Sequence, residues 1–249
     1  METPISPGEV VMSYIDFEKL EAIDGRAFRT NQPYPWANPA GLLTDTGHRA
    51  LLETLPAASQ FQEVVGKARK FGQRSHDRLS LEYQPDLELA PPWRDFLAEL
   101  RGARYLEALC RLFGRRALDL RFHWHYTGRG CSVSPHCDSM HKLGSHIFYL
   151  NSEKDWDLSW GGETLILEAE RYPNRRSAPE IEDFDRVIES DHLGNRSLLF
   201  MRRGDSWHAV REIQCPEGQF RKVFIVVINR VGPVETLRRI ATGRHEGSA

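Results

Sequence analysis

Residues 118–126, LDLRFHWHY, alternate apolar and polar side chains over the length of a whole strand. Successive side chains of a strand point to opposite faces of the sheet. One face would therefore carry the apolar residues Leu118, Leu120, Phe122, Trp124 and Tyr126, and the other Arg121, His123 and His125. The pattern predicts a half-buried strand whose polar face looks into a barrel or toward solvent.

The spacing of apolar residues changes from helical to strand-like near residue 117. Upstream, apolar residues recur every three or four positions in segments 61–68, 93–100 and 105–113, which predicts helices. Downstream, apolar runs between turns predict strands at 145–151, 163–169, 197–201, 207–213 and 221–229. Helices followed by many short strands indicate an α+β fold, with helices packed on one face of a β-sandwich or barrel.

The same change in spacing predicts three regions along the chain, all within a single structural domain. Residues 1–116 are expected to form an irregular and helical support region, with segment 1–40 draped on the core. Residues 117–232 would form the β-rich core and residues 233–249 a C-terminal tail. Within the core, residues 170–196 are charge-rich with few apolar anchors, so we expect an inserted surface loop there.

The composition is that of an ordinary globular protein. The 249 residues carry a formal net charge of -2, which gives no reason to expect a nucleic acid or a membrane surface as partner. Four cysteines do not form a disulfide framework in a chain of this length, and the first residues lack the pattern of a secretory signal. We therefore expect a cytoplasmic protein. The sequence contains no indication of its oligomeric state.

A possible metal site is formed by His136, Asp138 and His208, called the triad below. On an extended segment, His136 and Asp138 point to the same side and can share a metal ion, while Cys137 points away. His208 would come from a separate strand. Two imidazoles and one carboxylate cap one face of a ferrous ion and leave positions open for chemistry. His-x-Asp alone is a weak signal, so its specificity depends on the surrounding sequence.

Several short motifs surround the triad in a fixed order. They are the turn-rich segment 128–135, Phe148-Tyr149-Leu150-Asn151, Gly161-Gly162-Glu163-Thr164, Trp207-His208-Ala209-Val210 and a basic residue soon after Gly218. Over residues 117–230 this order resembles the Fe(II)- and 2-oxoglutarate-dependent dioxygenases, specifically the prolyl 4-hydroxylase-like branch. The resemblance implies a double-stranded β-helix (jelly roll) whose larger sheet is supported by the N-terminal helices.

The resemblance also implies an oxygenase that uses Fe(II), 2-oxoglutarate and O2. The triad would ligate the iron. Arg221 would pair with the distal carboxylate of 2-oxoglutarate, which suits a planar bidentate donor. Lys222 is the alternative, because prolyl hydroxylases commonly use lysine here and both faces of segment 221–229 are apolar. The distance from His208 favours Arg221.

Other residues are expected to face the substrate or co-substrate. In the family, a tyrosine in the loop before the first ligand often reaches 2-oxoglutarate, and Tyr126 is the candidate here. Arg121, His123 and His125 are candidates for lining the cavity. Halogenating relatives lack the carboxylate, so Asp138 favours hydroxylation of an unactivated C–H bond, with release of succinate and CO2. The substrate would be a small molecule, such as an amino acid or natural-product intermediate, or a protein side chain.

Two other functions use the same kind of barrel. A cupin-type metal enzyme that does not use 2-oxoglutarate would take His123 and His125 as its first ligand pair. No glutamate follows at the short spacing expected for it, and Arg221 would have no role. A non-catalytic jelly-roll binding module with a vestigial site is disfavoured by the intact triad.

Overall fold

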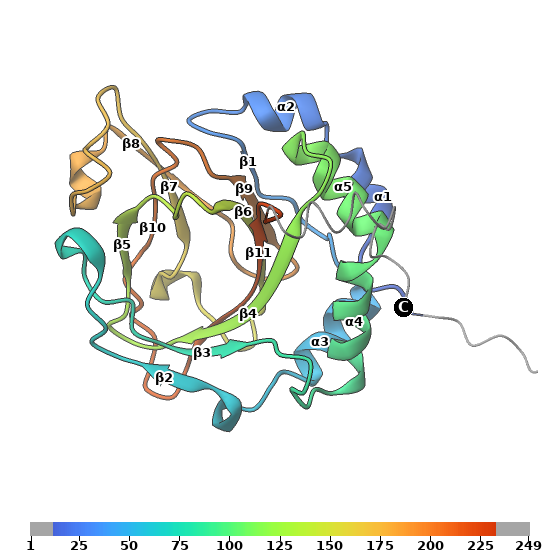
Figure 1. Cartoon of the computed structure of the whole chain (residues 1–249). Helices are drawn as coiled ribbons and strands as arrows, with labels where there is room; N and C mark the ends of the chain where they lie inside the picture. Colours follow the sequence, from blue (N-terminus) through green and yellow to red (C-terminus); the bar gives the residue numbers. More distant parts are fainter. Residues whose placement is uncertain (1–11, 233–249) are drawn as a thin grey trace, which may run out of the picture.

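The computed structural model describes residues 12–232 and shows two antiparallel β-sheets that face each other across a cavity (Figure 1). The larger sheet has seven strands in the order β1-β9-β6-β11-β4-β3-β2, and the smaller has four in the order β5-β10-β7-β8. This arrangement confirms the predicted double-stranded β-helix. The strands are β1 (Trp36–Ala37), β2 (Gln62–Val64), β3 (Arg78–Glu82), β4 (Asp119–Thr127), β5 (Val133–His136), β6 (Lys142–Tyr149), β7 (Thr164–Glu168), β8 (Arg186–Glu189), β9 (Ser197–Met201), β10 (His208–Val210) and β11 (Arg221–Asn229).

Strands β4 and β11 lie near the middle of the larger sheet and pair along their whole lengths. The alternation predicted for residues 118–126 is present in β4. Phe122 and Trp124 are buried in the core beneath the helices, whereas His123 and His125 line the cavity. The polar face of this strand therefore looks into the barrel, which settles the alternative that the sequence leaves open.

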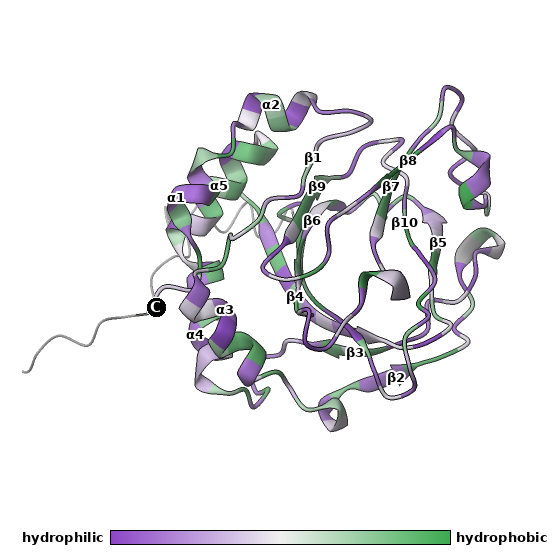
Figure 2. Cartoon of the chain, turned by 180° about the vertical axis from the view of Figure 1, so that it is seen from behind, coloured by the Kyte–Doolittle hydropathy of each residue, from purple (hydrophilic) through white to green (hydrophobic). Residues whose placement is uncertain are grey.

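Helices pack on the outer face of the larger sheet, as predicted (Figure 1). Their buried residues join one core with the apolar sides of β4, β6 and β11. Helix α5 accordingly has hydrophobic stretches beside hydrophilic ones (Figure 2). In the described part of the chain the α-helices are α1 (Phe17–Ala22), α2 (Gly25–Thr30), α3 (Asp45–Glu53), α4 (Pro91–Arg101) and α5 (Ala103–Phe113). Short 3-10 helices are η1 (Ala58–Gln60), η2 (Lys70–Gly72), η3 (Leu158–Trp160) and η4 (Ile181–Asp183).

The sequence predicts α4 and α5 for identifiable reasons. Pro91 lies in the first turn of α4, where its missing N–H costs no hydrogen bond. Gly114 ends α5 in the left-handed conformation, with φ 61°. Between them the helices bury Trp93, Phe96 and Leu109 completely, so the periodic apolar positions are those that meet the sheet.

The helix predicted over residues 61–68 is wrong. Gln62–Val64 instead form β2, an edge strand that pairs with β3. Phe61 packs on Tyr126 with ring centroids 4.2 Å apart, whereas Val65 is 63% exposed. The helical spacing was therefore coincidental, because these side chains do not share one buried face.

Two segments expected to be irregular contain regular structure. Segment 1–40 includes α1, α2 and β1, and segment 170–196 includes η4 and β8, which pairs with β7. The N-terminal region thus supplies β1, β2 and β3 to the larger sheet besides its helices. The C-terminal tail, 233–249, lies outside the described residues. Within residues 12–232, no helix combines the length and apolar character that crossing a membrane requires.

Candidate metal centre and co-substrate pocket

The three residues of the triad converge at one end of the smaller sheet. His136 ends β5 and His208 begins β10, and the two are directly opposite in the antiparallel pair. Their rings lie 4.3 Å apart between centroids. Asp138 follows His136 by two residues, and one ligand atom from each of the three side chains lies within 4.8 Å of the others. Pairing of β5 with β10 therefore brings together His136 and His208, which are 72 positions apart in the chain.

Both histidines are oriented by backbone carbonyls. His136 Nδ1 lies 3.0 Å from the Ser134 carbonyl oxygen, and His208 Nδ1 lies 3.0 Å from that of Ser206. A carbonyl only accepts hydrogen bonds, so each Nδ1 must donate. In neutral imidazoles this leaves the lone pair on Nε2 of each ring. Hydrogen bonds of this kind fix the tautomer of metal-binding histidines.

Charge in the triad also suits a divalent cation. Burial lowers the pKa of His136 and of His208, which keeps both rings neutral. Burial alone would raise the pKa of Asp138. The Lys142 ammonium, 2.9 Å from Asp138 Oδ1, is the main group that opposes this effect, and the pKa falls to about 2. The donor set is thus two neutral imidazoles and a carboxylate, which fits Fe(II).

Arg221 is a buried cation with spare hydrogen-bonding capacity. It is 6% exposed, and its Nη2 donates to Thr164 Oγ1 at 3.3 Å. Its guanidinium lies over the Tyr149 ring, 5.6 Å from the centroid. No group among residues 12–232 accepts from its Nε, and no carboxylate of these residues is within ion-pair distance. Since an unpaired buried charge is costly, this position is suited to an anionic ligand.

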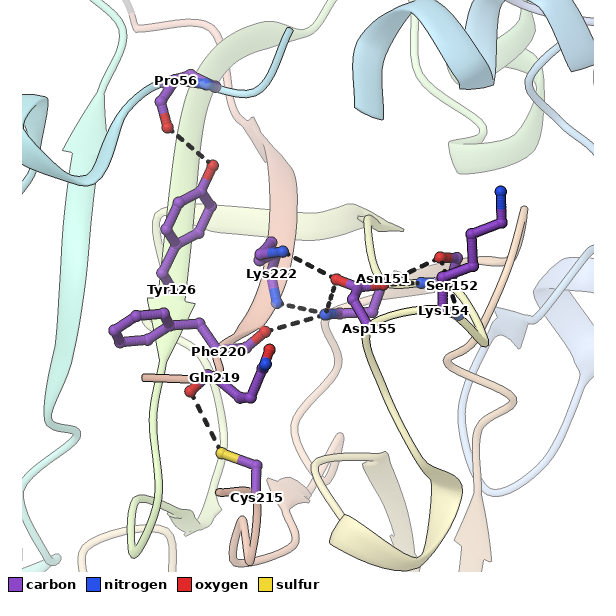
Figure 3. A network of polar contacts seen from close by, with 10 residues as sticks. All are labelled: Pro56, Tyr126, Asn151, Ser152, Lys154, Asp155, Cys215, Gln219, Phe220 and Lys222. Carbon is purple, nitrogen blue, oxygen red and sulfur yellow. Dashed lines mark hydrogen bonds and ion pairs between the residues drawn. The ribbon is translucent and has the colours of Figure 1, made fainter. Parts of the chain in front are cut away.

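Lys222 points to the opposite side of β11. Its Nζ forms an ion pair with Asp155 Oδ2 at 2.8 Å, outside the cavity (Figure 3). Arg221, Val223 and Ile225 line the cavity instead, because alternate residues of β11 share one face. Of the two adjacent cations, the structure places only Arg221 in the pocket.

Tyr126 is not brought to the pocket, which corrects the expectation from the resemblance. It lies on the helix-facing side of β4, and its hydroxyl donates to the Pro56 carbonyl oxygen at 3.2 Å (Figure 3). The alternation that points His125 into the cavity points Tyr126 out of it. Two residues not predicted from sequence, Tyr149 and Thr164, contact Arg221 instead. Both lie within motifs that carry the resemblance.

Asn151 holds the backbone on both sides of Arg221. Its Oδ1 accepts from the Lys222 N–H at 2.6 Å, and its Nδ2 donates to the Phe220 carbonyl oxygen at 2.9 Å (Figure 3). The same Nδ2 donates to Asp155 Oδ2 at 3.0 Å, which links these two backbone hydrogen bonds to the ion pair between Lys222 and Asp155. The start of β11 is therefore fixed by side-chain contacts as well as by sheet pairing.

The triad and Arg221 line one cavity of about 1430 Å³. This volume exceeds that of a typical small-ligand pocket, roughly 300–1,000 Å³. Arg121, His123 and His125 line the cavity, as proposed from the sequence. His123 and His125 belong to β4 in the larger sheet, apart from the triad, so the structure does not support them as the first ligand pair of a cupin-type site.

Comparisons with known proteins rest on structure. No protein-family model and no curated protein matches the chain in sequence. A prolyl-4-hydroxylase from Pseudomonas putida superposes with TM-score 0.59 and 15% identity, over 85% of this chain and 99% of that one. A prolyl hydroxylase from Trichoplax adhaerens, solved with a hypoxia inducible factor peptide fragment, gives TM-score 0.60 and 15% identity, over 92% and 94%. A prolyl 4-hydroxylase from Phytophthora capsici gives TM-score 0.53 and 14% identity, over 94% and 77%. This chain therefore has the double-stranded β-helix fold of the prolyl hydroxylases among the 2-oxoglutarate- and Fe(II)-dependent oxygenases.

Proposed function

We propose that this chain is an Fe(II)- and 2-oxoglutarate-dependent oxygenase that hydroxylates an unactivated C–H bond and releases succinate and CO2. One observation carries the proposal. The triad directs two fixed Nε2 lone pairs and a carboxylate into the same cavity that contains Arg221, a buried arginine without an acidic partner among residues 12–232. A metal site and a carboxylate site in one cavity match the two ends of 2-oxoglutarate.

Each group of residues has a defined part in this proposal. The triad would hold Fe(II) on one side and leave the other side open. Arg221, with the Thr164 hydroxyl beside it, would bind the distal carboxylate and so orient the co-substrate. The bound metal would supply O2 activation coupled to decarboxylation. Apolar cavity residues such as Val223 and Ile225 would limit water near the reacting groups.

The retained carboxylate supports hydroxylation rather than halogenation. Asp138 is buried, ionised and turned toward the two histidines. It would therefore occupy the coordination position that a halide requires. The size of the cavity fits a substrate larger than the co-substrate alone, either a small molecule or a protein side chain. One structural neighbour is a prolyl hydroxylase in complex with a peptide fragment, which shows that this fold admits a polypeptide.

We also propose a reducing compartment, the cytoplasm, as the location of this protein. Among the residues that the structure describes, Cys131, Cys137 and Cys215 are free thiols. Free thiols persist where glutathione and thioredoxin keep them reduced. The same conditions keep iron ferrous.

Anaerobic spectroscopy tests the proposed function. Fe(II) and 2-oxoglutarate together are expected to produce a weak charge-transfer band in the visible region, and admission of air is expected to yield succinate. His208→Ala should abolish both signals because it removes one of three metal ligands. The proposal fails if the wild-type protein gives neither the band nor succinate, or if His208→Ala gives both at the wild-type level.

A further inference from the structure

The cavity wall contains more positive charge than the proposed chemistry uses. Seven cationic side chains line it, Lys67, Arg69, Arg78, Arg121, Lys142, Arg221 and Arg230, against the three carboxylates Glu82, Asp119 and Asp138. Lys142 is paired with Asp138, and Arg221 is assigned to 2-oxoglutarate. Lys67, Arg121 and Arg230 are exposed at the rim. Arg69 and Arg78 are the partly buried cations for which the proposed function has no role.

Arg69 and Arg78 lack acidic partners in the part of the chain that the structure describes. Arg69 Nη1 and Arg78 Nε are buried atoms without a hydrogen-bond acceptor among these residues. Arg78 Nη1 donates to the His76 carbonyl oxygen at 2.8 Å, which orients the guanidinium without neutralising it. The adjacent acid, Asp77, accepts from the Gly66 N–H at 2.9 Å. Both arginines thus line the cavity and retain donors that no described residue satisfies.

Sheet register separates Arg78 from the co-substrate pocket. Arg221 of β11 is opposite Thr127 of β4, and β3 pairs with β4 so that Leu79 is opposite Tyr126. Arg78 therefore lies beside Thr127, two strands away from Arg221. With strands about 4.8 Å apart, their Cα atoms are separated by roughly 10 Å. One co-substrate carboxylate bound to Arg221 would leave Arg78 available.

The groups around the two arginines favour a bound anion beside them. Burial lowers the pKa of Arg78, and the positive charge of Arg69 lowers it further, so the two charges repel each other. Burial also lowers the pKa of Arg69, an effect that the Asp138 carboxylate partly offsets. His76 and His125 flank them with rings 5.9 Å apart. Both imidazoles are neutral at physiological pH because burial lowers their pKa values, that of His76 to about 3. An anion would relieve the repulsion between the arginines and accept their free donors.

We propose that Arg69 and Arg78 bind an anionic group of the substrate, a carboxylate or a phosphate, so that the molecule hydroxylated at the triad is an acid. This assignment rests on the proposed function, because it names the substrate class of the same cavity. The guanidinium fork pairs with two oxygens of either anion. Anchoring the acid at β3 would extend the rest of the substrate toward the triad on the opposite sheet.

Calorimetric titration with simple anions tests this assignment. The protein is held anaerobically with Fe(II) and saturating 2-oxoglutarate, so that Arg221 is occupied. It is titrated with sodium acetate for the carboxylate and with sodium sulfate as a non-chelating analogue of phosphate, at ionic strength balanced with sodium chloride. Arg69→Gln and Arg78→Gln are each expected to weaken binding of the preferred anion by about tenfold. Arg94→Gln, which removes an exposed charge from α4, serves as the control and should bind as wild type does.

The outcomes separate this inference from the proposed function. Loss of acetate binding in the two variants identifies a carboxylate site, and loss of sulfate binding a phosphate site. Equal binding of both anions by wild type, Arg69→Gln and Arg78→Gln overturns the assignment, even where the charge-transfer band is intact. The titration is repeated without Fe(II) and 2-oxoglutarate. If the band never forms but anion binding still depends on Arg69 and Arg78, the anion site stands and the proposed function falls.

Discussion

Arg221 and Lys222 carry the same charge on adjacent residues, yet the structure gives them opposite environments. Arg221→Gln removes a buried cation that has no ion pair within the described part of the chain, and it should raise the Kd for 2-oxoglutarate by at least about tenfold, since charge-assisted hydrogen bonds contribute roughly 1.5–3 kcal/mol. Lys222→Met removes the ion pair with Asp155 and should change this Kd much less. Titration of the charge-transfer band measures both. A larger effect of Lys222→Met would reverse the assignment of the co-substrate cation.

Metal binding should appear as thermal stabilisation that depends on single ligands. A metal present at ~100 times its Kd stabilises the folded state by about 2.7 kcal/mol, which raises Tm by several degrees in a chain of this size. Wild type should show this shift when Fe(II) is added anaerobically and lose it when a chelator is added. Asp138→Ala should abolish the shift. His141→Ala, which removes an exposed imidazole near the triad, should retain it. A full shift in Asp138→Ala would contradict the ligand assignment.

At the residue scale, local spacing was enough to predict some positions and not others. The two-residue spacing of His136 and Asp138 predicts that both can bind one metal ion, and the order of the motifs identifies His208 as the third ligand. For Arg221 and Lys222 both faces of the strand are apolar, so the choice required knowledge of which face meets the helices. Tyr126 is different, because the alternation of residues 118–126 already grouped it with Trp124 on the face that packs against the helices. Its expected contact with 2-oxoglutarate came from the resemblance and conflicted with the strand pattern.

Asn151 connects the end of β6 with the start of β11, and it is a positioning residue for Arg221. Asn151→Ala would remove its contacts to the backbone on both sides of Arg221. Each lost hydrogen bond costs about 0.5–1.5 kcal/mol, so the Kd for 2-oxoglutarate should rise several-fold while Fe(II) binding persists. Ser152→Ala, which removes a hydroxyl contact to Asp155 in the same turn, is the matched control. Equal effects of the two variants would show that the turn as a whole, rather than Asn151, positions the arginine.

The turn before β7 approaches Arg221 so closely that any larger residue at position 162 would displace the arginine side chain. Gly162 has φ +87°, and a Cβ there would lie 3.0 Å from Arg221 Cδ. Gly194 has a similar φ of +73°, yet nothing lies within 4 Å of a Cβ at that position. Alanine at either position should lose about 1–3 kcal/mol of stability through backbone strain. Only Gly162→Ala should also weaken 2-oxoglutarate binding. Denaturant unfolding and the charge-transfer titration separate these effects, and matched Kd values in the two variants would contradict the steric argument.

At the scale of elements, prediction succeeded where an element is long and periodic. Helices α4 and α5 and strand β4 have repeating apolar positions, whereas β9 and β11 are uninterrupted apolar runs with clear ends. The short strands β2 and β8, with three and four residues, contain too few positions to establish a period. Their identity depends on partners brought close by the fold. Arg69 follows β2 and Arg78 begins β3, so their place at the cavity depends on the same strand pairings.

The helical layer and the larger sheet should unfold as one unit. Trp93 of α4 is fully buried and packs against Trp124 of β4 and Phe224 of β11, with ring centroids 5.1 and 5.2 Å apart. Trp93→Ala should lower the free energy of unfolding by about 3–5 kcal/mol through loss of buried contacts and formation of a cavity. Leu158→Ala, at a site 59% exposed, should change it by less than about 0.5 kcal/mol. A small effect of Trp93→Ala in urea denaturation would indicate that α4 is not coupled to the sheet.

At the scale of the whole molecule, the order of helices before strands was sufficient to predict the fold class. The predicted division near residue 117 does not describe the larger sheet, because β1, β2 and β3 precede that point and pair with later strands. Contacts between distant segments decide which strands pair, and the spacing of apolar residues along the chain does not predict these contacts. The cavity is likewise a property of the assembled sheets.

The neighbouring cations at the start of β11 constrain how this gene can change in length. Deletion of one residue from the turn that ends at Gly218 would shift the register of β11 against its neighbouring strands by one residue. Lys222 would then occupy the position of Arg221. The pocket would still contain a positive charge. The same shift would turn Phe224, Val226 and Ile228 away from the helices and into the cavity. Insertions and deletions in this turn should therefore be selected against for the sake of the core, even where the charge is preserved.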